Sequence, residues 1–328
     1  MSTSATNRLR TRGGGLRRPG AGGATGRGDR VLHGLCAVAG LLAVVVLVEV
    51  VYQVIHGSRP AISEFGVGFL GHSVWAPVFN NFGAAAAIYG TALSSLMALV
   101  IATPLGIAIA LYLSMMAPPV VRAIVGPLVE MLAAIPSVIV GFWGVDVLAP
   151  FAAHHLEPFL HGVLGFIPLF GPPQTTGLSV FSAGLVLTLM ILPIVAALSR
   201  DLFLTVPGEL TDGAAALGAT RWEIIRGVVL PSTASGVAAA TVLGLGRALG
   251  EAIAVLQVIG DGAGIHSSLF LPGISLASRI AGEFTNAGGK LEIPSLFYLA
   301  LILLAFGLTT SLLARWIAGR FDVHRMLA

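Results

Sequence analysis

Residues 228–259 read VVLPSTASGVAAATVLGLGRALGEAIAVLQVI, and the only charged side chains in this stretch are Arg247 and Glu251. A helix of about 20 apolar residues crosses the hydrocarbon core of a bilayer, so this run is long enough to span a membrane with both charges inside it. An unpaired arginine at that depth costs roughly 2.5–3.5 kcal/mol on insertion scales. Because residues four apart on a helix share a face, the sequence predicts that Glu251 neutralises Arg247.

The composition extends this interpretation to most of the chain. Of its 328 residues, 56% are hydrophobic and 10% are charged, and the mean hydropathy is +0.93. Lipid offers no hydrogen-bond partner to an exposed backbone, so the chain is expected to be an all-α polytopic membrane protein. The single cysteine, Cys36, rules out an internal disulfide framework and is expected to be a small packing residue.

Six apolar windows have the length needed to cross a bilayer. We expect transmembrane helices at 31–55, 84–113, 121–150, 177–199, 228–259 and 294–318. The second and third windows contain Pro104, Pro127 and Pro136, which predicts kinks or tilt in those helices.

The ends of the chain differ from its apolar middle. Residues 1–30 are rich in arginine and glycine and are predicted to form a disordered cytoplasmic tail that touches anionic lipid, in preference to nucleic acid. Residues 31–83 are expected to form a first, uncleaved transmembrane helix and an outer loop. The core is expected at 84–320, with a cytoplasmic loop at 205–231, and a second cytoplasmic tail at 321–328.

The basic residues are distributed unequally between the two sides of the membrane. With six spans, fourteen arginines fall on the side of the two termini, Arg315 among them. Only Arg59, Arg279 and Lys290 fall on the opposite side. Cytoplasmic loops carry the excess of lysine and arginine, so both termini are predicted to be cytoplasmic.

Residues 151–176 give the weakest pattern of the core. They hold His154, His155, Glu157 and His161, followed by a short apolar run and Gly171-Pro-Pro. We expect an outer loop with a short, wetted interfacial helix. No cysteine or second acid completes a set with metal-ligand spacing, so no metal site is predicted.

The loop at 205–231 has a local pattern of helix, turn and helix. Pro207 suits a first turn, and Gly218 suits the left-handed residue that ends a helix. Thr220 and Glu223 form a Thr-x-x-Glu capping box for the next helix. The pattern predicts a short helix lying across the membrane face, followed by one that leads into the fifth span.

Several other classes of protein are disfavoured by the sequence. No Gly-x-x-x-x-Gly-Lys-Ser/Thr loop is present, so the chain is not expected to hydrolyse ATP. The glycines at 244, 246 and 250 have the wrong spacing for a dinucleotide-binding loop. The sequence has no catalytic set at membrane depth, which disfavours an intramembrane enzyme. It has no clear internal repeat, which disfavours an ion-driven secondary transporter.

The 205–231 loop resembles the "EAA" loop of ABC-importer permeases. Asp212, Gly213 and Ala214 stand for its Glu-Ala-Ala triplet, Gly218 follows after three residues, and Leu230-Pro231 close the motif. Asp for Glu, Gly for Ala and Val228 for Ile are departures that keep the spacing. The resemblance implies that this loop docks into a cleft of an ATPase subunit and couples it to the helices.

Further segments narrow the resemblance. Residues 130–144 (EMLAAIPSVIVGFWG), Leu192-Pro193 and residues 246–251 (GRALGE) are together similar to one of the two membrane subunits of high-affinity phosphate ABC importers. The likeness covers about 84–318. It implies a six-helix permease in which Arg247 and Glu251 belong to the substrate pathway. Pro136 and Ser137 would mark a helix break, and Glu130 beside them could line the pathway, face a partner or sit near the inner interface. A permease for sulfate, molybdate or phosphonate is the alternative.

The resemblance also implies partners. These are a sister permease, a homodimeric ATPase subunit that uses ATP and Mg²⁺, and an extracytoplasmic phosphate-binding protein, in a bacterial cytoplasmic membrane. The outer loops at 56–83, 151–176 and 260–293 would receive the binding protein. This chain itself is expected to bind no cofactor and no metal. Gly246 and Gly250 form a small-residue face that allows close helix contact, so Arg247 and Glu251 could instead serve contact with the sister subunit.

Overall fold

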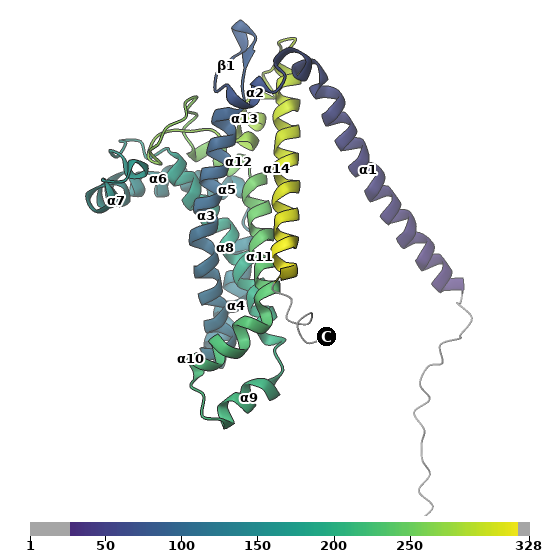
Figure 1. The fold of residues 1–328 in the computed structure, drawn as a ribbon, viewed down its shortest axis with the longest axis vertical. Coiled ribbons are helices and arrows are strands. Elements are labelled where there is room, and N and C mark those ends of the chain that lie inside the picture. The colour runs from purple at the N-terminus through teal and green to yellow at the C-terminus, as the bar shows by residue number, and fades with distance from the viewer. Residues whose placement is uncertain (1–26, 321–328) are drawn as a thin grey trace, which may run out of the picture. The chain divides into compact units, whose positions relative to one another are not determined.

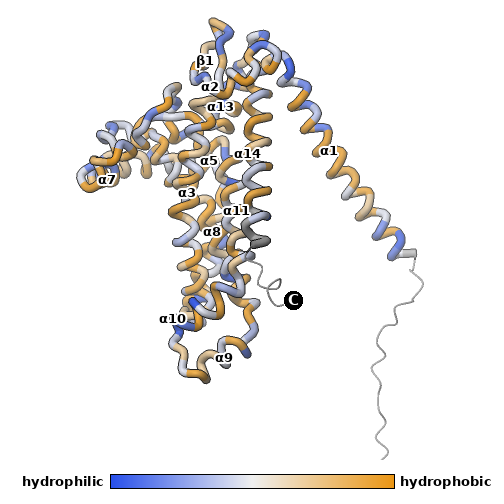
Figure 2. The backbone as a smooth tube through the Cα atoms, viewed as in Figure 1, coloured by the Kyte–Doolittle hydropathy of each residue, from blue (hydrophilic) through white to orange (hydrophobic). Residues whose placement is uncertain are grey.

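The computed structural model describes residues 27–320, and within this range the chain is almost entirely helical (Figure 1). The predicted tails therefore lie outside the described residues up to residue 26 and from residue 321. Six described helical stretches are long and apolar enough to cross a membrane. They are Gly28–Phe65, Ala85–Met116, Ser137–Leu164, Val180–Leu204, Arg221–Gly250 and Glu292–Leu313. Hydrophobic residues run along most of these helices (Figure 2).

The first spanning helix, α1 (Arg27–Phe65), passes from one compact unit of the chain into another. The contacts divide the chain into Met1–Tyr52 and Gln53–Ala328. In the first unit, the apolar side chains of residues 31–50 are exposed along the helix, as expected of a segment that lipid surrounds. The helix is ten residues longer at its C-terminal end than the predicted span 31–55.

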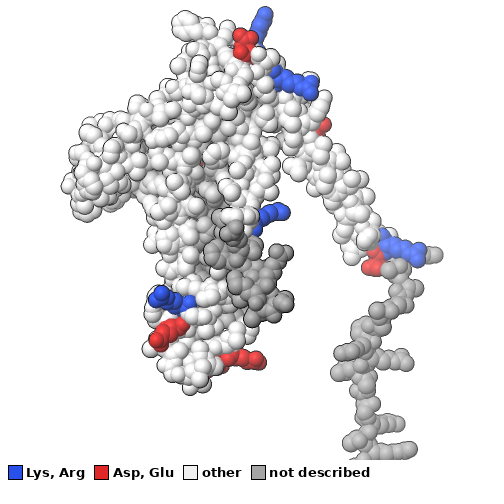
Figure 3. Space-filling model, in the orientation of Figure 1, with Lys and Arg blue, Asp and Glu red and all other residues white. Residues whose placement is uncertain are grey.

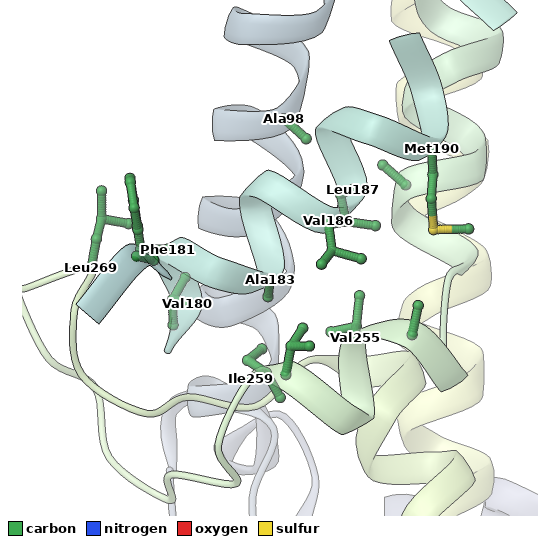
Figure 4. Close-up of a cluster of buried hydrophobic side chains, with 14 of the residues drawn as sticks. Ala98, Val180, Phe181, Ala183, Val186, Leu187, Met190, Val255, Ile259 and Leu269 are labelled. Carbon is green, nitrogen blue, oxygen red and sulfur yellow. The ribbon is translucent and has the colours of Figure 1, made fainter. Parts of the chain in front are cut away.

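The centre of the second unit is a bundle of three helices. α3 (Ala85–Leu111), α8 (Val180–Leu204) and α11 (Leu230–Gly250) pack against one another, and α14 (Glu292–Arg320) packs on α11. The small residues Ala98 and Ala183 let α3 and α8 approach closely, and Leu187 and Val255 fill the space beside them (Figure 4). The most buried of the six spans is α8, which the other helices surround.

The third predicted span, 121–150, is not one helix. α4 (Pro119–Ala133) ends before Pro136, and α5 (Ser137–Trp143) starts a new helix directly after it. Pro136 has no backbone N–H to donate, and its ring disfavours a helical residue before it, which separates the two segments. The stretch that is long and apolar enough to span is Ser137–Leu164, so the prediction is corrected by more than a dozen residues.

Residues 151–164 are helical and continue from α5, so the helix here is longer than the short interfacial one predicted within an outer loop. The helix continues from α5 through single turns of wider π geometry to α7 (Glu157–Leu164). The intermediate segments are η3 (Gly144–Leu148), α6 (Ala149–Phe151) and η4 (Ala152–Leu156), and η5 (Pro168–Phe170) follows α7. Leu156 and Leu160 pack against the central core and hold this helical segment to the bundle.

Glu157 is completely buried, at 0% exposure. Its two carboxyl oxygens accept hydrogen bonds from the Gln174 backbone N–H at 3.1 Å and from the Ser179 hydroxyl at 3.4 Å. Ser179 in turn caps the N-terminus of α8 by accepting from the Ser182 N–H at 3.2 Å. Glu157 thus ties the 174–179 turn to α7 and holds the start of the central helix.

We predict that Glu157→Ala lowers the melting temperature of the detergent-purified protein by several degrees. The substitution leaves the Gln174 N–H buried without its acceptor, at a cost of about 1–3 kcal/mol. Glu157→Gln is expected to retain most of the stability, because its side-chain carbonyl can accept the same bond. Thermal unfolding followed by fluorescence measures both, and equal melting temperatures for the two variants would contradict this role.

The end of the bundle opposite α9 carries a small ribbon. α2 (Gly68–Gly71) leads into β1 (Trp75–Ala76), η1 (Pro77–Phe79) and β2 (Asn81–Phe82), and the two strands pair antiparallel with Trp75 opposite Phe82. Arg279, on α13 (Leu276–Glu283), lies under this ribbon with its guanidinium 5.5 Å from the Trp75 ring centre and 2.9 Å from the Glu283 carboxylate. Arg279, which the sequence assigned to an outer loop, is therefore buried.

Candidate functional site

The fifth span is interrupted at the predicted site. α11 ends at Gly250, Glu251 has an extended backbone (φ −74°, ψ 116°), and α12 (Ile253–Val258) begins after it. The prediction of an unbroken helix through residue 259 is therefore wrong. Glu251 accounts for the new start, because its Oε1 accepts a hydrogen bond from the Ala254 N–H at 3.4 Å. Its carboxylate thus acts at a helix N-terminus, where negative charge is favoured.

Arg247 and Glu251 still form an ion pair across this break. The shortest distance, from Nη2 of Arg247 to Oε2 of Glu251, is 3.9 Å, and Glu251 is the only ion-pair partner that Arg247 has among the described residues. The Glu251 side chain is 9% exposed and the Arg247 side chain 41%. The carboxylate is thus fixed at the helix break, while the Arg247 side chain stays partly open to an incoming group.

Arg247 lines two cavities, of which the second is the more polar. The first, of about 380 Å³, is apolar except for Arg247 and is lined by Leu132, Ala133, Ile135, Ile139, Val140, Trp143, Leu189 and Met190. The second is a more open groove of about 780 Å³. Its lining is Ile194, Ala239, Val242, Leu243, Gly246, Arg247, Gly250, Glu251, Ser311 and Arg315.

The predicted helix break at Pro136–Ser137 forms one wall of the apolar cavity. Residues on both sides of the break, Ile135 and Ile139, line it together with Trp143. The interruption of the third span and that of the fifth span therefore border the same region, with Arg247 between them. Broken spanning helices of this kind are tolerated where they line a cavity inside the protein.

The glycines at 246 and 250 leave the groove open. No atom lies within 4 Å of the position that a Cβ would occupy at either residue. The predicted small-residue face of α11 is therefore present and is not filled by another described element. It provides room either for a close helix partner or for a solute beside Arg247.

Arg315 is a groove residue that sequence reasoning missed. It was counted only as a basic residue for orientation, yet it lies on α14 and lines the groove with Ser311, four residues before it. An arginine in the last turns of an apolar helix is usually an interfacial anchor, so its type and position gave no signal of a site. Only the packing of α14 against α11 brings it to Arg247.

Glu130 does not line either cavity. Its Oε1 lies 2.8 Å from Nη2 of Arg200, which also contacts Asp201 at 2.9 Å. Arg200 was expected in a loop, but it belongs to α8 and joins that helix to α4. Of the three alternatives considered for Glu130, a place near the inner interface is the one that this contact favours, because Arg200 holds the carboxylate away from both cavities.

The 205–231 segment has the predicted backbone. α9 (Gly208–Ala216) begins after Pro207 and contains Asp212, Gly213 and Ala214, and Gly218 has a left-handed φ of +88°. The Thr220–Glu223 capping box opens α10 (Arg221–Ile224), with a distance of 2.7 Å from the Thr220 N–H to Glu223 Oε2.

After α10 comes a single wide turn, η6 (Ile225–Val229), and Leu230-Pro231 then start α11. The loop projects from one end of the bundle (Figure 1). It presents exposed apolar side chains there, with Leu217 91% exposed and Trp222 64%. Large apolar side chains displayed on a projecting helical loop are typical of a contact surface for another protein.

Comparison with known families defines the class of protein. A family model described as "Binding-protein-dependent transport system inner membrane component" matches residues 102–323, and the chain belongs to that family. The match includes both interrupted spans, Arg247, Glu251 and the whole projecting loop. The chain is a component of a transport system and a multi-pass inner-membrane protein.

The relatives narrow the class to the PstC permeases. "Phosphate transport system permease protein PstC" of Mesorhizobium japonicum is 42% identical over 90% of this chain and 91% of its own length. The protein of the same name from Pasteurella multocida is 44% identical over 82% and 84%. PstC 2 of Mycobacterium tuberculosis is 36% identical over 89% and 92%.

The fold also matches solved structures. A chain in the crystal structure of a bacterial alginate ABC transporter, in complex with an alginate pentasaccharide-bound periplasmic protein, superposes with a TM-score of 0.61. The match covers 90% of this chain and 97% of that one, at 16% identity. At that identity the likeness supports the fold, the ABC importer permease type, and says nothing about substrate.

Proposed function

We propose that this protein is a permease subunit of an ATP-driven importer that moves inorganic phosphate across the cytoplasmic membrane. The observation that carries the proposal is the position of Arg247 in a chain similar to PstC proteins over most of its length. It lies in a spanning helix and lines a groove, and Glu251, at 3.9 Å, is its one ion-pair partner within the part of the chain that the structure describes.

The chemistry of the site suits a small, multiply charged oxyanion. The guanidinium offers a planar set of donors that match two oxygens of phosphate at once. Glu251 lowers the cost of burying this charge when no substrate is present, because it stays nearby at 3.9 Å. Arriving phosphate then accepts hydrogen bonds from the guanidinium N–H groups that Glu251 does not engage. When phosphate leaves, Glu251 again balances the charge of Arg247 alone.

The projecting loop is the proposed coupling element. In the orientation predicted from the basic residues, with both termini in the cytoplasm, α9 and α10 lie on the cytoplasmic side. Exposed Leu217 and Trp222 would contact an ATPase subunit there. That partner, present in two copies, would bind ATP and Mg²⁺ and perform the hydrolysis, whereas this chain binds no cofactor or metal.

Two more partners complete the proposed machine. A sister permease would cover the open face of Gly246 and Gly250. An extracytoplasmic phosphate-binding protein would deliver its anion to the end that carries the β1–β2 ribbon and α13. Arg247 would then lie close to the sister subunit as well as to the pathway.

Labelled-phosphate uptake in cells that lack this gene tests the proposal. Complementation with the wild-type gene is expected to restore uptake of phosphate and leave sulfate and molybdate uptake unchanged. Restoration of sulfate or molybdate uptake instead would keep the permease fold and overturn the substrate, because one arginine can hold any of these tetrahedral anions.

A further inference from the structure

We propose that Arg315 is a second substrate-binding cation, which receives the anion from Arg247 on the way to the α9 end of the bundle. The inference rests on the proposed function and extends it from one cationic residue to two. It starts from the groove between α11 and α14, which both arginines line.

The groove has a direction along α11. The lining residues Ala239, Leu243, Gly246 and Gly250 are spaced three or four apart and therefore form one stripe of the helix. From residue 239 to residue 250 such a stripe is roughly 16 Å long. Its far end is the helix break at Glu251, and its near end lies toward the projecting loop from which α11 starts.

Arg315 belongs to the near end of this stripe. α14 runs antiparallel to α11 (Figure 1), so its last turns lie toward the start of α11, where the projecting loop joins it. Arg315 is exposed and lies one helical turn beyond Ser311 on the same face of α14. Basic surface is visible beside the lower end of α14, within an otherwise uncharged stretch of the bundle (Figure 3).

The charges of the groove favour passage of an anion over trapping it. The lining contains two arginines and one glutamate, a formal charge of +1. Glu251 lies at the Arg247 end, so the positive potential at Arg315 is the less compensated of the two. A solute moves through a pathway when it meets several binding sites and none of them binds it too tightly. Arg315, as a second cation on the exit side, meets that requirement. Gly246 and Gly250 leave space beside Arg247, and Ala239 and Ser311 are the small lining residues farther along the groove.

The first test separates a pathway role from that of a membrane anchor. We expect Arg315→Gln to lower phosphate uptake about tenfold, the effect of losing one charge-assisted contact, with the subunit still present in the purified complex. Trp316 is exposed at the same depth but does not line the groove, so Arg315→Gln/Trp316→Arg restores the charge on another face. This double variant is expected to stay defective, and recovery of uptake in it would overturn the proposal.

The second test needs no transport. Ser311→Cys in a Cys36→Ala background places one thiol in the groove, and its labelling by anionic and cationic thiol reagents is compared in the intact complex. We expect the anionic-to-cationic rate ratio to fall several-fold when Arg315 becomes Gln, and an unchanged ratio would overturn the proposal. If wild type restores no phosphate uptake, the proposed function fails, while this ratio still decides whether Arg315 sets the groove's potential.

Discussion

Arg247→Gln is expected to reduce phosphate uptake about a hundredfold or more while the subunit still assembles with its partners. Glutamine keeps the length and polarity of the side chain but loses the charge and the planar fork, and a charge-assisted hydrogen bond to an anion contributes about 1.5–3 kcal/mol. Two such bonds would account for the loss. The measurement is initial-rate uptake of labelled phosphate in complemented cells, with recovery of the complex checked by affinity purification.

A double variant separates a substrate role from simple neutralisation of Glu251. If Arg247 serves only to balance that carboxylate, then Arg247→Gln/Glu251→Gln, which removes both charges, recovers uptake. A contact to the anion predicts that the double variant stays inactive. Arg30→Gln is the matched control, because it removes an exposed arginine that lines neither cavity, and it is expected to leave uptake unchanged. Normal uptake in Arg247→Gln would sink the proposed role.

The projecting loop shows how much local sequence can predict. Its turn depends on one glycine and its second helix on a Thr-x-x-Glu pair, and both signals operate within a few residues. The structure confirms them, with Gly218 at φ +88° and the capping box formed. Where backbone geometry is decided by neighbours in the chain, the pattern alone was sufficient.

The interruption of the fifth span needed tertiary structure. Hydropathy does not distinguish a straight apolar helix from a broken one, so the window at 228–259 gave no boundary at Glu251, whereas Pro136 did predict the break in the window at 121–150. The break at Glu251 is stabilised by a contact from its own carboxylate to the Ala254 N–H. The burial of Glu157 depends on the Gln174 N–H and Ser179, and no spacing rule connects those residues.

The groove illustrates the same limit at the level of the site. Arg247 was predicted from its position in an apolar run, because an arginine there is costly wherever it points. Arg315 is near the end of its helix, where an arginine is ordinary. It joins the site only because α14 packs on α11, a contact between segments about seventy residues apart. The sequence therefore identified Arg247, whose burial is unfavourable, and missed Arg315, whose position near a helix end is ordinary.

Gly218→Val is expected to uncouple ATP hydrolysis from transport. A side chain at a left-handed φ costs roughly 1–2 kcal/mol, and a β-branched one costs more, so the turn between α9 and α10 would open or shift. Since α9 has only nine residues and none of them is buried, its own stability is too low to hold the turn in place. The prediction is a normal basal ATPase rate in reconstituted complex, without the rise that phosphate-loaded binding protein produces in wild type.

Gly227→Val is the matched control for this effect. Like Gly218, Gly227 has open space around the position of an added Cβ, but its backbone is helical and takes any L-residue. We expect Gly227→Val to keep stimulated hydrolysis close to wild type. Equal loss in both variants would attribute the defect to added bulk at this end of the bundle. Unchanged stimulation in Gly218→Val would mean that the left-handed turn is dispensable for coupling. The strain that valine adds would then be absorbed without moving α9.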